Sequence, residues 1–261
     1  MPPNKKQQDQ GLKLLEQGDI YFLYRPQVSE KEARVRSPKE IQRFYMVLKP
    51  QGKRRYRLMM VPKKQLPTSR KGGEKLWGFV DKVSSKALEV EDELDRREYQ
   101  TKTRGERVQP EARPAGEGVY AIVEHGDHTH LAYVLELPDL PGEVQKSLNI
   151  AEEASYIISV KNPEQPSPKG LGLDESSQAD FPKKLQDRFR GRRFVKVAPP
   201  EFLNHEGAEL LLIGAPGDAY EDLGIELEDE DESESTAEIF RDLRLEKSQH
   251  PTEPLLKGKW A

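Results

Sequence analysis

Residues 119–137, VYAIVEHGDHTHLAYVLEL, contain two runs rich in β-branched and aromatic residues on either side of Gly126-Asp127. Gly-Asp at such a junction predicts a two-residue hairpin turn, because glycine readily adopts the positive φ that these turns require. A turn of this length pairs His125 directly with His128. Side chains alternate along strands, so one face is apolar and the other carries the histidines. The apolar face comprises Tyr120, Ile122, Leu131, Tyr133 and Leu135.

Three histidines gather at the tip of this hairpin. His125, His128 and His130 fall on its polar face, where cross-strand neighbours lie about 5 Å apart. This spacing favours a divalent metal site, with Zn or Fe as the ion and an open position for water, in which Asp127 orients a histidine or acts as a base. The same cluster also fits a metal-free binding patch, or a structural polar face with no ligand.

The rest of the chain adds further short strands separated by turn residues. Nine such segments against a few short helices, without regular βαβ alternation, predict an α+β fold with mainly antiparallel sheets. Helices are expected at residues 12–15, 88–98, 142–149 and 182–190. A faint similarity between residues 56–61 and 129–134, each followed by Leu-Pro and a later strand, raises the possibility of two similar halves.

Composition divides the chain into six segments. The expected order is a flexible start (1–10), a first strand-rich half (11–99), a polar crossover loop (100–117), a second half with the histidine hairpin (118–215), an acidic disordered linker (216–236), and a tail with a short amphipathic helix (237–261). The linker prediction rests on nine carboxylates and no basic residue in residues 220–236.

The composition also limits the setting and the chemistry. The chain has no cysteine, which excludes a disulfide framework or a thiolate site and fits a reducing compartment. Neither a secretory signal nor an apolar run long enough to span a membrane is evident. We therefore expect a soluble cytoplasmic protein that does not contact membranes.

The tail combines charge with apolar side chains. Ser235-Thr236-Ala237-Glu238 resembles a helix capping box, and a tryptophan with leucines follows it. Such a peptide is typical of a docking segment, so we expect it to bind either another protein or the chain's own sheet. The side chains expected to make the contact are Phe240, Leu243, Leu255, Leu256 and Trp260.

A second basic and aromatic motif is RFRGRRF at residues 188–194. Interleaved cations and aromatic rings favour the binding of phosphates or nucleic acid. Helix capping at Gly191 with solvated arginines is the alternative. The candidate anion-binding residues are Arg188, Arg190, Arg192 and Arg193.

These features favour a non-enzymatic binding or adaptor protein. The chain lacks the P-loop, GxGxxG, GxSxG and HExxH motifs. The alternative is a metal-dependent enzyme, a hydrolase in the first instance, that uses the three histidines as ligands.

Overall fold

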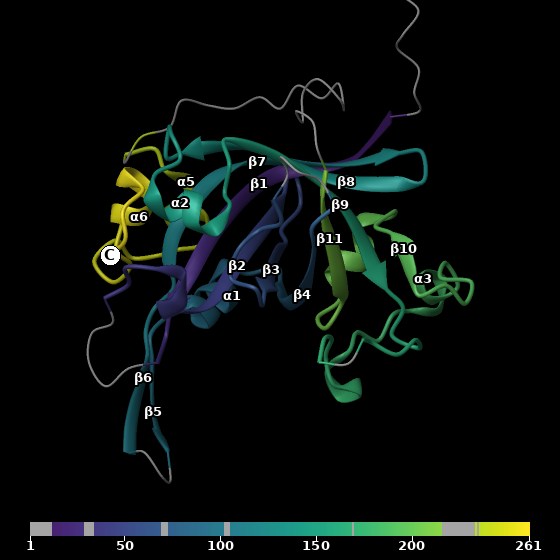
Figure 1. Ribbon diagram of the computed structural model, residues 1–261, viewed down its shortest axis with the longest axis horizontal. Helices are drawn as coiled ribbons and strands as arrows, with labels where there is room; N and C mark the ends of the chain where they lie inside the picture. Colours follow the sequence, from purple (N-terminus) through teal and green to yellow (C-terminus); the bar gives the residue numbers. More distant parts are fainter. Residues whose placement is uncertain are drawn as a thin grey trace, which may run out of the picture.

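Eight strands form a closed antiparallel barrel in the computed structural model of this chain. The structure describes residues 12–28, 34–68, 73–101, 105–168, 170–215, 233 and 235–261. Around the barrel the order is β1-β2-β3-β4-β11-β9-β8-β7, and β7 pairs with β1 (Figure 1). These strands are β1 (Leu12–Pro26), β2 (Ile41–Pro50), β3 (Tyr56–Val61), β4 (Lys75–Ser84), β7 (Arg113–His125), β8 (His128–Leu137), β9 (Glu153–Lys161) and β11 (Glu209–Ala215).

Short elements decorate this barrel. Strand β10 (Phe194–Lys196) pairs with β9 alone, and β5 (Arg97–Thr101) pairs with β6 (Gly105–Gln109) in a separate projecting ribbon (Figure 1). The helices are α1 (Ala87–Leu94), α2 (Glu143–Leu148), α3 (Lys183–Gln186), α5 (Glu238–Asp242) and α6 (Glu253–Lys257), with 3-10 turns η1 (Pro38–Glu40), η2 (Glu175–Ser177) and η3 (Pro200–Asn204). None of the helices in the described ranges has the length and apolar character needed to cross a membrane.

The predicted α+β class is wrong. The strands do not form open sheets with helices packed on them, because β8 pairs with β9 and β4 pairs with β11 to close the ring. Closure removes the unpaired edges that an open sheet would expose. The sequence pattern did not reveal it, since these pairings join segments that are distant along the chain.

The two predicted halves meet within the one barrel. Strands β1 to β4 form one four-stranded meander, and β7, β8, β9 and β11 form the other. The suggested sequence similarity does not follow this division. It aligns β3 (residues 56–61), third in its meander, with β8 (residues 129–134), second in the other.

Strand β1 is longer than the sequence suggested. The helix expected at residues 12–15 is absent, because Leu12 and Leu14 continue the strand and pair with His125 and Val123 of β7. Gly18 lies in this strand where β2 comes so close that an added Cβ would stand 2.1 Å from the backbone oxygen of Lys49.

The interior of the barrel is a packed hydrophobic core to which every barrel strand contributes. Phe22 lies at its centre, stacked against Phe44 and in edge contact with Tyr133, at centroid distances of 6.3 and 5.0 Å. The predicted hairpin register is confirmed: His125 pairs with His128, and Leu131 and Tyr133 are buried. The turn is made by Gly126, with φ of 56°.

Buried ion pairs fix the segment between β9 and β11 to one end of the barrel. The Glu16 carboxylate accepts hydrogen bonds from both terminal nitrogens of Arg57 and from the Tyr120 hydroxyl, and Arg57 Nε donates to Asn204 Oδ1 at 2.9 Å. Lys161 and Glu209 form a second buried pair at 2.8 Å. Both pairs hold connecting loops in place.

Other predicted segments differ in detail. The polar stretch 100–117 is not one crossover loop: it contains β6 and the start of β7. Helix α1 ends at Leu94, short of the predicted residue 98, because β5 begins at Arg97. The start at residues 1–10 and the acidic run up to residue 232 lie outside the described residues.

Candidate functional site

The tail segment, residues 235–261, packs on the outer face of the barrel. Its helices α5 and α6 lie beside β7, and together with α1 they cover the outward side chains of β1 and β2 (Figure 1). Fully buried side chains meet there from both sides. From the barrel come Tyr21, Leu23, Tyr45, Val47 and Leu58, and from the tail come Ile239, Leu243, Leu245 and Leu255. In the structure the tail segment therefore lies on the chain's own barrel.

A carboxylate on β7 receives the amino end of α5. The Glu117 side chain is buried and accepts hydrogen bonds from the backbone nitrogens of Glu238 and Ile239, at 2.5 and 3.2 Å. Helix N-termini present unsatisfied N–H groups and a partial positive charge, so a carboxylate there satisfies both. The predicted capping box at Ser235 is therefore replaced by a cap from a distant strand.

The other end of α5 is held by Asp242. The Tyr21 hydroxyl donates to its carboxylate at 2.6 Å, and the Lys49 ammonium forms an ion pair with it. Lys49 also pairs with Asp19 at 2.7 Å. We call Glu117, Tyr21 and Lys49 the clamp, because these barrel side chains hold both ends of the helix.

Charge within the clamp is balanced through Lys49. Burial would raise the pKa of Asp242, but hydrogen bonds from Lys49 and Tyr21 outweigh it and hold that pKa below its usual value. Burial dominates at Asp19, whose pKa is raised although Lys49 opposes the shift. Burial lowers the pKa of Lys49, and its two carboxylate partners reverse this and raise it. Lys49 and Asp242 therefore form a charged pair at neutral pH, while burial raises the pKa of Tyr21, which donates to Asp242 as a neutral hydroxyl.

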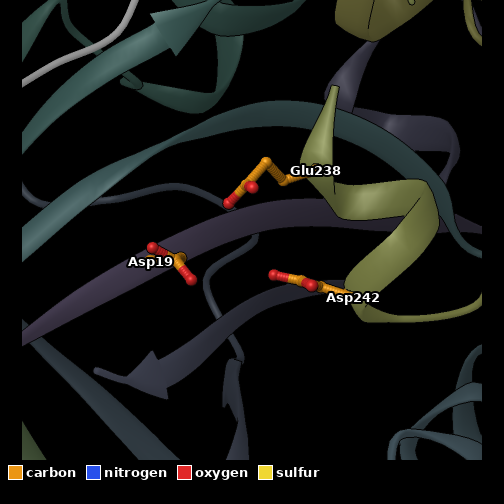
Figure 2. A group of neighbouring side chains, drawn as sticks. All are labelled: Asp19, Glu238 and Asp242. Atoms are coloured by element: carbon orange, nitrogen blue, oxygen red, sulfur yellow. The ribbon is translucent and has the colours of Figure 1, made fainter. Parts of the chain in front are cut away.

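Asp19, Glu238 and Asp242 also satisfy the geometry of a metal site. Their carboxylates point toward a common space (Figure 2), with one oxygen of each within 4.8 Å of the others. Among the described residues this is the one such group of three or more metal-ligating side chains. Lys49 pairs with Asp19 and Asp242, and Arg241 pairs with Glu238 and Asp242, so these two cations already bring positive charge to the three carboxylates.

The end of the tail segment is held at several further points. Trp260 makes an edge contact with Tyr24 at 5.3 Å, and the Ala261 backbone oxygen accepts from the Val35 backbone nitrogen at 3.0 Å and from Arg113. Buried Gln145 of α2 donates to the Pro254 oxygen at 2.8 Å. The apolar side chains predicted to dock are buried (Leu243, Leu255) or partly buried (Phe240, Leu256, Trp260).

The histidine cluster lies at the opposite end of the barrel. His128 and Asp127 are exposed, and His125 and His130 are half-buried with ring centroids 6.1 Å apart. The Nδ1 atom of His130 lies 3.1 Å from the Ser155 hydroxyl. The three imidazoles do not converge as closely as the carboxylates around Lys49.

The arginine motif separates into two layers. Arg188, Arg190, Arg192 and Arg193 are exposed, whereas Phe189 is buried against Phe181 and Phe202. Phe194 is half-buried on the outer wall. Only one of the two phenylalanines is therefore positioned to meet a ligand.

Sequence reasoning missed the clamp. The sequence pattern places Glu117 in the polar stretch 100–117 and indicates no role for Asp19 or Lys49. A signal was present, since Glu117 stands between Gly116 and Gly118, directly before the apolar run of residues 119–123. A charged residue at such a position requires a partner.

Comparison of the chain with protein-family models, with curated proteins and with solved structures finds no match.

Proposed function

We propose that this protein is a non-enzymatic binding protein whose docking surface is the outer face of β1, β2 and β7. In the structure the tail segment covers that surface. A partner protein with a short amphipathic helix would take the place of α5, with apolar residues at the spacing of Ile239 and Leu243 and a carboxylate at the position of Asp242. The cysteine-free composition favours a cytoplasmic setting for this exchange.

The clamp is the observation that carries the proposal. A segment that only covered apolar surface would not need contacts with charged side chains at both ends of its helix. Glu117 and Lys49 instead select a helix by its amino end and by an acidic residue one turn later. Polar contacts of this kind set orientation and specificity more than affinity.

The covalent link between the tail and the barrel sets how strongly a partner must bind in order to replace the tail. Because the tail is joined to β11 through the acidic stretch, its concentration at the surface far exceeds that of a free partner. An external helix must therefore compete with it. Each clamp contact contributes about 1–3 kcal/mol, so losing or gaining one contact shifts the balance between the tail and an external helix.

The test separates the tail from the barrel without removing it. A specific protease site is inserted within residues 216–232, the purified chain is cut, and a fluorescent peptide of residues 235–261 is added. We expect the peptide to exchange into the cut protein and raise its anisotropy. Lys49→Met should weaken binding by about 5- to 100-fold. Lys63→Met is the matched control, because Lys63 is exposed and its ammonium lies 3.8 Å from the nearest carboxylate oxygen, that of Glu74. A cut chain that never exchanges would make the tail a fixed part of the fold.

A divalent metal at the histidine hairpin is the second candidate, favoured by the 6.1 Å approach of the His125 and His130 rings. Small rotations of these side chains would bring them and His128 onto one ion, which would activate a bound water for hydrolysis. Titration with Zn²⁺ should then give one equivalent bound. Binding should be lost in the triple His→Ala variant and kept in Asp127→Asn. Equal binding by all three proteins would contradict the site.

A further inference from the structure

The segment from α3 to β10 has an unusual concentration of positive charge. Residues 183–196, KKLQDRFRGRRFVK, contain seven Lys or Arg and one carboxylate, Asp187. Six of these seven cations are exposed. In Figure 1 the segment lies at the opposite side of the molecule from α5 and α6.

The backbone of this segment is held firmly against the barrel. Phe189 packs on Phe181 and Phe202 at centroid distances of 5.8 and 5.5 Å. The backbone oxygens of Arg192 and Arg193 both accept hydrogen bonds from Asn162, at 3.2 and 2.8 Å. The arginine side chains thus project from a fixed base, which limits the entropy lost when they bind a ligand.

These cations are not neutralised by the rest of the described chain. Lys196 pairs with Glu124 at 2.7 Å, but the other six form no ion pair with any residue in the described ranges. Lys49, Arg57 and Lys161, in contrast, are each paired with a carboxylate. Uncompensated positive charge on a fixed surface attracts polyanions.

Aromatic rings stand next to the cations. Phe194 and Trp77 are both half-buried on the outer wall, and their ring centroids lie 5.9 Å apart. Trp77 on β4 is opposite Leu211 of β11, and Phe194 on β10 is opposite Lys161 of β9. Strands β9 and β11 lie between β10 and β4, so the two rings approach each other across these two strands.

We propose that this surface binds single-stranded nucleic acid. The strand would run along β10, with phosphates on Arg192 and Arg193 and bases stacked on Phe194 and Trp77. Proteins that bind single strands without strict sequence preference combine these two features, a basic track and partly exposed aromatic rings. The closed barrel supplies the rigid wall.

Single strands fit better than the other polyanions. A duplex would reach the arginines, but its bases are stacked within it and could not use the two rings. An acidic peptide, such as one with the sequence of residues 220–236, would pair with the arginines and leave the aromatic pair without a role. The aromatic pair therefore distinguishes these ligands.

The experiment measures binding of a fluorescein-labelled oligothymidylate of about 20 nucleotides to the full chain by anisotropy, over a range of salt concentrations. We expect Phe194→Leu to weaken binding about 5- to 150-fold, since each stacked base contributes this much. The double variant Arg192→Gln/Arg193→Gln should make the slope of log K against log salt shallower by about 1.4, for two lost phosphate contacts.

The matched control is the double variant Lys63→Gln/Arg96→Gln, which removes two exposed cations elsewhere. It should bind like the parent, and circular dichroism should show all variants folded. A labelled peptide of residues 220–236 and a duplex of equal length are run in parallel. Absence of oligonucleotide binding would overturn the proposal. So would equal losses in test and control variants, tighter binding of the duplex or peptide, or indifference to Phe194→Leu.

Discussion

The outer wall of the barrel is covered on one side and open on the other. Over β1 and β2, Tyr21, Leu23 and Val47 are completely buried because the tail segment and α1 lie on them. Over β4, β11 and β10, Trp77, Leu211 and Phe194 remain half-buried. Charges follow the same division: Lys49 forms ion pairs on the covered side, whereas the arginines of residues 188–193 form none with the residues that the structure describes. The hydrophobic core explains only the side chains that point into the barrel. The exposure of side chains on each part of the outer wall therefore needs a separate explanation.

Matched leucine truncations give the largest expected difference between the walls. Leu243→Ala removes a fully buried side chain from the covered side and should cost about 2–4 kcal/mol. Leu211→Ala removes a half-buried side chain from the open side and should cost about half as much or less. Urea denaturation followed by circular dichroism measures both. Equal costs would mean that the covered wall is not more tightly packed.

Loss of a lysine from each wall should give a smaller difference. Lys49→Met leaves Asp19 and Asp242 without their shared cation and should cost about 1–3 kcal/mol. Lys196→Met breaks a single pair with Glu124 and should cost about 0.2–1 kcal/mol. The comparison fails if thermal and urea unfolding rank the two variants in the opposite order.

Acid should loosen the covered wall. The pKa of Asp242 is depressed in the folded protein, so its contribution is fully present above its unfolded pKa of about 3.9. That contribution is lost as the pH falls through the lower folded value. The pKa of Asp19 is raised, and its protonation acts in the opposite direction. We therefore expect tail release only below about pH 4, seen as a red shift of Trp260 emission in a Trp77→Phe variant. Release between pH 5 and 7 would contradict the assignment to Asp242.

The histidine hairpin should show the smallest effect on stability. His130→Ala removes a half-buried ring and its contact with Ser155, and should cost about 0.5–1 kcal/mol in the absence of metal. The result is measured by urea denaturation in the presence of a chelator. A cost above about 2 kcal/mol is typical of a side chain packed in a hydrophobic core, and it would contradict the half-buried position of His130.

Local chemistry made part of this structure predictable. Gly126-Asp127 set the hairpin length, and the alternation beyond it placed Leu131 inside and His130 outside, as observed. The short spacing of apolar side chains in the tail likewise predicted a docking segment. Both predictions depend on residues within a few positions of one another.

Closure and coverage depend on contacts that are distant in sequence, and these were not predictable. Nothing in Glu209 or Phe79 indicates that β11 pairs with β4. The strand DIYFLYR at residues 19–25 is apolar on both faces, which is the pattern of a strand buried on both sides. The missing step was to ask which segment covers its second face.

The order of elements along the chain has a consequence for synthesis. All eight barrel strands precede the tail segment, so a ribosome completes the barrel before the helices that cover β1 and β2 have emerged. During that interval Tyr21, Leu23 and Val47 lack the tail helices that complete their cover in the finished structure. A partner present at translation meets this surface without competition from the tail, and the nascent chain is also most prone to aggregation at that moment.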